Sequence, residues 1–159
     1  NVGPVVLQMR QAGLEGPIVG GDGYDTPDIV SVAGDSSSNV FFTTHALMDS
    51  EIGTDGIKAF IAAYTEKYGH APENAFAALG YDAVKLLADA IERAGSTDAT
   101  AIQTALQETT DFPGITGSIT FGEGVQIPQK GVTIIEIVDQ KFTLAAEVVP
   151  EVVPPANPE

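Results

Sequence analysis

Apolar side chains recur at helical spacing in the middle third of the chain. Residues 57–68 carry an isoleucine or an aromatic ring every three or four positions and are followed by Gly69, which predicts an amphipathic helix. A longer apolar stripe begins after residues 72–73 and ends at Gly95. Residues 96–98 then offer capping side chains for another helix that reaches Leu106. The middle of the chain is therefore predicted to be helical.

Short segments rich in apolar and β-branched residues flank this helical region and predict strands. The first two are each preceded by a short helix, at residues 4–13 and 26–34. In the second of these helices Thr26 is the expected N-cap and Pro27 the first helical residue. The predicted strands are residues 17–20, which we interpret as buried, 39–44, 118–121, 132–138 and 142–148.

The order of these elements indicates the fold class. Helices and strands alternate over the first 44 residues, three helices follow, and three strands come last, with a hairpin expected at residues 139–141. This order is typical of a Rossmann-like α/β fold with a mainly parallel sheet and late antiparallel strands. Residues 48–53 are the expected crossover between two lobes, and residues 150–159 are expected to form a Pro-rich, acidic, extended tail.

Composition excludes several classes of function. The 159 residues include 22 acidic and 7 basic side chains, for a net charge of −15, which disfavours binding to nucleic acid or to anionic lipid. The chain has no cysteine, so disulfides, thiolate metal sites and cysteine nucleophiles are absent. No apolar run approaches the 18 or so residues that a membrane-spanning helix needs.

Asp22 is the acidic residue that most clearly suggests a ligand-binding role. It lies in the sequence Gly20-Gly21-Asp22-Gly23, predicted as a flexible loop at the carboxyl end of a strand, where open α/β sheets place ligands. Its carboxylate can pair with an ammonium group, and the glycines let backbone approach a ligand closely. The alternative is a turn aspartate that hydrogen-bonds its own backbone. A phosphate-binding loop is rejected, because the GxxxxGK[ST] and GxGxxG patterns are absent.

Metal and nucleophile patterns are missing elsewhere. His45 and His70 have no HxxxH or HExxH spacing, and the acids at 22, 25 and 28 lack the DxDxDG pattern of a calcium loop. We interpret those acids as a solvated turn and a helix N-terminus, and residues 36–38 as a serine-rich loop. No GxSxG sequence is present, so neither a catalytic residue nor a metal site is predicted.

Two aromatic side chains in the long helix have open roles. Phe76 and Tyr81 are five residues apart and so do not share a helix face. For either ring alone, packing in the core is the favoured interpretation. Phe76 lies near the start of the helix, where its ring can instead reach into a cleft.

Three segments together resemble the carboxyl-terminal half of the branched-chain amino-acid binding proteins of ABC importers, which have the type I periplasmic-binding fold. The resemblance covers about residues 3–145 and is carried by the segments in this order and spacing. The segments are LQMRQAGLEGPIVGGDGYDTPDIVSVAGD, FIAAYTEKYGHAPENAFAALGYDAVKLLADAIERAGSTD and TGSITFGEGVQIPQKGVTIIEIVDQKF.

The resemblance implies two lobes that close on a ligand like a hinge. Residues 1–46 would be a late part of lobe two, residues 47–121 lobe-one helices and a strand, and residues 122–149 a return to lobe two. Family chains are about twice as long, so this chain is expected to be a fragment that lacks the groups holding the ligand's α-carboxylate. Its exposed faces would favour self-association.

The resemblance also implies the binding residues. Asp22 matches the acid that pairs with the α-ammonium of an amino acid in the family. Phe76 matches an aromatic residue that lines the side-chain pocket in some members. Gly21 and Gly23 flank the acid, and Tyr24 is expected at the mouth of the cleft.

The implied function is solute binding without catalysis and without a cofactor. The ligand would be an aliphatic or branched-chain amino acid or a related small solute, and the partner a membrane permease of an ABC importer. The location would be periplasmic or extracellular, with a lipid anchor possible through a missing amino terminus. A ligand-sensing regulatory domain of the same fold is the alternative, because fold alone does not fix function.

Overall fold

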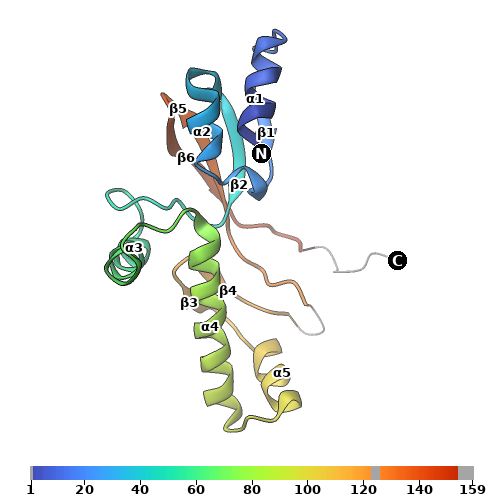
Figure 1. Ribbon diagram of the computed structural model, residues 1–159. Helices are drawn as coiled ribbons and strands as arrows, with labels where there is room; N and C mark the ends of the chain where they lie inside the picture. Colours follow the sequence, from blue (N-terminus) through green and yellow to red (C-terminus); the bar gives the residue numbers. More distant parts are fainter. Residues whose placement is uncertain (1, 123–125, 154–159) are drawn as a thin grey trace. The chain divides into compact units, whose positions relative to one another are not determined.

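The computed structural model describes residues 2–122 and 126–153 (Figure 1). The chain divides into two compact units. The first contains the residues up to Ala75 together with Val132–Val148, and the second contains Phe76–Gly131 together with the residues from Val149 on. The assignment of residues 1–46 and 122–149 to one lobe and of 47–121 to another stays a prediction.

A four-stranded mixed sheet forms the centre of the first unit. Its strand order is β1-β2-β5-β6. β1 and β2 are parallel, β5 is antiparallel to β2, and β6 is antiparallel to β5. The late strands are therefore antiparallel as expected, but the four-stranded sheet is not mainly parallel, because the two late strands contribute two of its three pairings. The strands are β1 (Ile18–Gly20), β2 (Val40–Thr44), β5 (Val132–Val138) and β6 (Lys141–Val148).

Two helices, α1 (Val2–Gln11) and α2 (Asp28–Ala33), pack side by side against one face of this sheet (Figure 1). Side chains alternate between buried and partly exposed along β2 and β5, because successive residues of a strand point to opposite faces. Val19 is 75% exposed, so the prediction of a fully buried first strand is wrong: helices cover only the face on which Ile18 lies. The buried core consists of Val2, Val6, Ile18, Ile29, Ala33, Val40, Phe42, Ile135 and Ile137.

Arg10, in the last turn of α1, donates hydrogen bonds to backbone carbonyl oxygens in two loops of this unit. Its guanidinium donates hydrogen bonds to the carbonyl oxygens of Leu14 and Gly16, each at 2.7 Å, and of Ser38 at 2.9 Å. Longer bonds reach the carbonyls of Ser36 and Asn39. A planar group with five donors can serve several loop carbonyls at once, which a lysine cannot.

The helix α3 (Asp55–Tyr68) of the first unit ends where the sequence pattern predicts and begins two residues before the apolar pattern. Thr54 caps its start by accepting the backbone N–H of Ile57, and Gly69 ends it in the left-handed conformation with φ +77°. The ring of Tyr64 lies between two other aromatic rings, with centroid distances of 5.8 Å to Phe60 and 4.6 Å to Tyr68. The helical spacing of these rings therefore produces a ladder along one side of α3.

The second unit is built on α4 (Ala75–Ala94), whose first residue belongs to the first unit, and on α5 (Ala99–Gln107). Asp98 caps α5 by accepting two backbone N–H groups, as predicted for residues 96–98. A short hairpin of β3 (Phe112–Gly114) and β4 (Gly117–Ile119) completes the unit, and the sequence analysis missed the first of these strands.

A buried carboxylate joins that hairpin to α4. Asp82 is 2% exposed and accepts the backbone N–H of Ile115 at 2.8 Å, and the backbone N–H and hydroxyl of Thr116 at 2.9 and 2.6 Å. Lys130 donates to the carbonyl oxygen of Thr116. Burial lowers the pKa of Lys130, and the nearby charge of Asp82 partly offsets this effect. The hairpin is therefore held by polar contacts that periodicity alone does not predict.

Other sequence predictions agree with the structure in outline. The β5–β6 hairpin turns through Asp139 and Gln140, both at positive φ. Thr26 accepts the backbone N–H of Asp28 at 3.3 Å, but α2 begins at Asp28 with Pro27 as its N-cap, so the predicted cap and first helical residue are each one position too early. Within the predicted serine-rich loop, Ser37 is buried in a 3-10 turn. Of the predicted tail, the structure describes residues 150–153, and the rest lies outside the described residues.

Candidate functional site

Asp22 lies just beyond the carboxyl end of β1, as predicted. The segment after Gly20 is a single 3-10 turn over Asp22–Tyr24 rather than the flexible loop expected from its glycines. The backbone N–H of Tyr24 donates to the carbonyl of Gly21, and that of Asp25 donates to the carbonyl of Asp22, each at 3.0 Å. The Asp22 side chain is 57% exposed. The turn therefore fixes the backbone of Asp22 and leaves its carboxylate accessible.

His45 lies within ion-pair distance of Asp22. Its Nε2 lies 3.6 Å from Oδ2 of Asp22, a separation that suits an ion pair when the imidazole is protonated and is too long for a good hydrogen bond. The histidine follows Thr44, the last residue of β2, and β2 is the parallel neighbour of β1. This pairing is not predicted from the sequence, although both residues follow predicted strands whose carboxyl ends can meet at one sheet edge.

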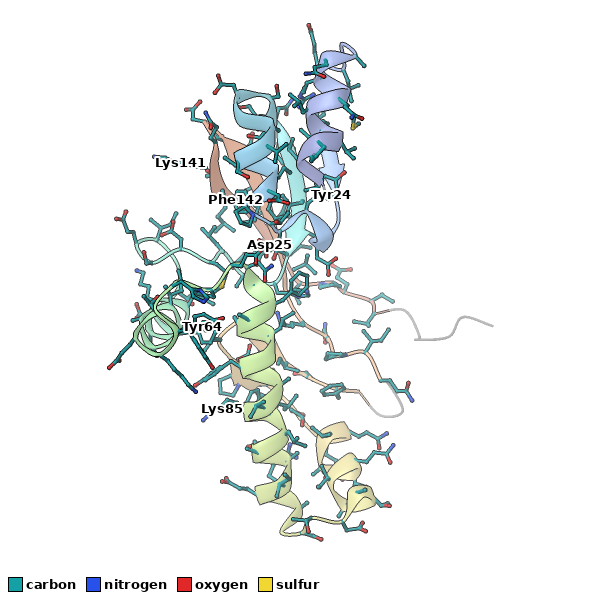
Figure 2. The ribbon with its side chains drawn as sticks, viewed as in Figure 1. Tyr24, Asp25, Tyr64, Lys85, Lys141 and Phe142 are labelled. Carbon is teal, nitrogen blue, oxygen red and sulfur yellow. The ribbon has the colours of Figure 1, made fainter. Side chains whose placement is uncertain are left out.

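Asp25 is buried, which corrects the interpretation of this acid as part of a solvated turn. It is 6% exposed, and its Oδ2 accepts the hydroxyl of Thr44 at 2.7 Å and the backbone N–H of Ala75 at 3.1 Å. Sequence spacing gave no sign of this, because both donors come from distant segments. Figure 2 labels Asp25 and Tyr24 in the segment that follows β1.

The ring of Tyr24 packs against the end of β1. It lies so close to Gly20 that a methyl group on that residue would come within 2.6 Å of ring carbons. Tyr24 is half-buried and packs against the hydrophobic core of the first unit. Its predicted place at the mouth of a cleft stays a prediction.

Gly21 and Gly23 flank Asp22 and are both exposed. A Cβ atom at either position would meet no atom of a non-neighbouring residue within 4 Å, and neither residue has positive φ. Their conformations therefore do not require glycine. What the two glycines provide is open backbone beside the carboxylate, available to a ligand.

Phe76 and Tyr81 are not core residues of the described structure. Phe76, the second residue of α4, is 44% exposed, and Tyr81 is 43% exposed. The core interpretation favoured for each ring alone is therefore wrong. The exposed ring of Phe76 is compatible with its predicted role in a ligand pocket, which the structure does not test.

A cavity of about 450 Å³ in the first unit lies apart from Asp22. Its walls come from α2, from the segment before α4 and from the β5–β6 hairpin, including Val30, Glu73 and Phe142. In the second unit, a more polar cavity of about 290 Å³ lies beside Arg93. Neither cavity includes a predicted ligand residue.

The described residues contain neither a group of metal ligands nor a helix that could span a membrane. Within residues 2–122 and 126–153, no three His, Cys, Asp or Glu side chains are grouped so that they could hold a metal ion. In the same part of the chain, no helix has the length and hydropathy needed to span a membrane.

Comparison with known sequences gives consistent matches. The family model for periplasmic binding proteins matches residues 1–141. The leucine-, isoleucine-, valine-, threonine- and alanine-binding protein of Pseudomonas aeruginosa is 30% identical over 136 residues, which are 86% of this chain and 35% of that protein. A Leu/Ile/Val-binding protein of Rhizobium johnstonii is 32% identical over 122 residues, 76% of this chain and 32% of that protein.

Solved structures match nearly the whole chain. A leucine binding protein of Thermotoga maritima is 34% identical with a TM-score of 0.79, and the match covers 94% of this chain and 42% of that one. The substrate binding protein of a branched-chain amino acid transporter of Streptococcus pneumoniae, solved with isoleucine, is also 34% identical with a TM-score of 0.73, over 93% and 41% of the two chains. These matches confirm the expected type I periplasmic-binding fold. The chain spans about a third of the length of the curated relatives it matches.

Proposed function

Because the chain belongs to the periplasmic binding protein family, we propose that it forms part of an extracytoplasmic solute-binding protein whose ligand is an aliphatic amino acid. Capture of the solute occurs without chemical change. The complete binding protein delivers its ligand to the permease of an ABC importer. The names of the relatives, which include leucine, isoleucine and valine, support this choice of ligand.

The observation that carries the proposal is the placement of Asp22. Its carboxylate is mostly exposed, follows the end of β1, and stands on a turn whose backbone is fixed by two hydrogen bonds. An α-ammonium group that docks here forms a charge-assisted hydrogen bond with Asp22, which strengthens when a closing lobe removes water. Gly21 and Gly23 leave room beside Asp22 for the atoms around the ligand's α-carbon.

The other predicted residues have supporting roles in this proposal. Phe76 provides an apolar wall for the ligand's side chain, as the family resemblance implies. Tyr24 holds the turn through its packing on Gly20. His45 provides an imidazole near Asp22 that competes with the ligand's ammonium when it is protonated.

The test is a calorimetric titration with leucine, isoleucine and valine. It uses this chain, and a chimera in which the chain replaces the equivalent part of the Thermotoga maritima leucine binding protein, which supplies the rest of the fold. We expect the Asp22→Asn variant of the chimera to bind leucine at least tenfold more weakly. Glu15→Gln, which removes an exposed acid of the same charge between α1 and β1, serves as the control. Equal affinities of the chimera and its Asp22→Asn variant would overturn the proposal.

A further inference from the structure

We propose that Asp25 is a positioning residue, which through one buried oxygen atom fixes both the turn that carries Asp22 and the first residue of α4. The proposal deepens the proposed function and rests on it where ligand affinity is concerned. The bonding pattern of Asp25 itself does not depend on any ligand.

The two bonds of Asp25 converge on a single atom. Oδ2 accepts the Thr44 hydroxyl at 2.7 Å and the Ala75 backbone N–H at 3.1 Å, and both bonds are buried. A carboxylate is costly to bury unless donors compensate for the lost water. Its burial at 6% exposure is therefore tied to these donors, and they are expected to hold it in one position.

The hydrogen bond from the Ala75 backbone N–H to Asp25 joins residues that are 50 positions apart in the chain. The acceptors that cap α3 and α5 are Thr54 and Asp98, which directly precede those helices. The N–H at the start of α4 instead reaches Asp25, 50 residues earlier. A negative charge at a helix N-terminus is also favoured by the helix dipole, and α4 is 20 residues long. This contact therefore links the start of α4 to the segment after β1.

Each bonded residue is close in the chain to a residue of the candidate site. Asp25 closes the 3-10 turn by donating its backbone N–H to the carbonyl of Asp22. Thr44 directly precedes His45, whose ring lies 3.6 Å from Asp22. Ala75 directly precedes Phe76. Loss of the Asp25 carboxylate therefore removes a hydrogen-bond acceptor from residues that directly precede His45 and Phe76, and is expected to loosen the backbone there.

Three variants separate positioning from a general effect on stability. Asp25→Ala removes the acceptor of both bonds. Asp25→Asn keeps an oxygen that can occupy the place of Oδ2 and accept from both donors, so it is expected to rescue the defect. Thr44→Val removes only the hydroxyl bond and serves as a second variant if Asp25→Ala does not fold.

The readout is amide hydrogen exchange measured by NMR on the full 159-residue chain. In Asp25→Ala we expect the amides of Ala75 and Asp25 to exchange at least tenfold faster, while the amide of Val6 in α1 keeps its rate. If Asp25→Ala does not fold, Thr44→Val must show the faster exchange at Ala75. A purely structural role would accelerate exchange at Val6 to the same extent, and unchanged exchange at Ala75 would overturn the proposal.

Leucine affinity is then measured on the same variants in the chimera. We expect at least a fivefold loss for Asp25→Ala and a change of less than twofold for Asp25→Asn. Faster exchange with unchanged affinity would overturn the positioning role. If the unsubstituted chimera binds no amino acid, the proposed function fails, and the exchange result alone decides whether Asp25 positions the turn and the helix.

Discussion

The ring of Tyr24 lies directly against Gly20, the last residue of β1. A methyl group at Gly20 would come within 2.6 Å of three ring carbons, closer than packed atoms approach. Because Tyr24 ends the 3-10 turn that begins at Asp22, the absence of a side chain at position 20 lets the turn fold back over the strand. The geometry of the candidate site therefore depends on a glycine that is not itself a predicted ligand residue.

Replacement of Gly20 by alanine should displace the ring and loosen the turn. Overpacking of this kind costs about 1–3 kcal/mol of unfolding free energy. Gly21→Ala is a matched control, because position 21 has open space and an extended conformation with φ −85°. Urea unfolding of the three chains measures the difference. If Gly20→Ala and Gly21→Ala have the same midpoint, the packing of Tyr24 does not constrain the turn.

Arg10→Lys should destabilise the first unit although it keeps the charge. The guanidinium serves the carbonyls of Leu14, Gly16 and Ser38 at 2.7–2.9 Å, and one ammonium group cannot reach all three. We expect a loss of about 1.5–3 kcal/mol, as for hydrogen bonds to charged groups, measured by the urea midpoint. Lys141→Gln, at an exposed position of β6, is the control and should change the midpoint little.

The elements that were predicted correctly have a local signal in the sequence. The helix over Asp55–Tyr68 is marked by apolar periodicity and by Gly69, and the cap of α5 by Asp98. The strand Phe112–Gly114 has no such signal, because it is three residues long and includes a proline. It is held by pairing with its partner strand β4. The turn between the two strands is held by hydrogen bonds to the buried Asp82, which lies in a distant segment of the chain. Short strands that depend on tertiary contacts cannot be recognised by alternation alone.

The candidate site was predictable only in part for a similar reason. Asp22 was identified from its position after a strand and between glycines. Asp25 has the same chemistry three residues later and was interpreted as solvated, because burial of an acid depends on donors brought by the fold. Thr44 and Ala75 supply those donors from 19 and 50 residues away. The proximity of His45 to Asp22 likewise follows from the parallel pairing of β1 with β2.

Substitution of Asp82 should have a large effect on the second unit. Its two carboxylate oxygens accept from three donors on Ile115 and Thr116, and Asn offers only one oxygen to them. We expect Asp82→Asn to cost about 1–3 kcal/mol, because at least one buried N–H loses its acceptor, and Asp82→Ala to cost more.

Asp89→Asn is the matched control on the same helix. Asp89 is 40% exposed in an ion pair with Arg93, and such pairs contribute about 0.5 kcal/mol. Urea unfolding followed by helical circular dichroism compares the variants. An equal loss for Asp82→Asn and Asp89→Asn would contradict the role of the buried carboxylate.

Asp49 should make part of the stability dependent on pH in the acidic range. Its carboxylate accepts the backbone N–H groups of Glu51 at 2.7 Å and Ile52 at 2.9 Å. These bonds, that to Ile52 foremost, lower the pKa of Asp49 below its ordinary value of 3.8. Since the folded chain holds this proton more weakly than the unfolded chain, the stabilisation is present above pH 3.8 and is lost as the pH falls through the lowered pKa.

The Asp49→Asn substitution keeps an acceptor oxygen and removes the charge. Relative to this variant, the unsubstituted chain should be more stable at pH 7 by at most about 0.5 kcal/mol, because the site is largely solvated. The difference should shrink as the pH falls through the lowered pKa of Asp49, where the aspartate becomes protonated in the folded chain as well. Urea midpoints of the two chains at pH 7, 4 and 2.5 measure it, with Glu15→Gln as a control that lacks these backbone bonds. A difference that stays constant from pH 7 to 2.5 would show that charge on Asp49 does not stabilise this turn.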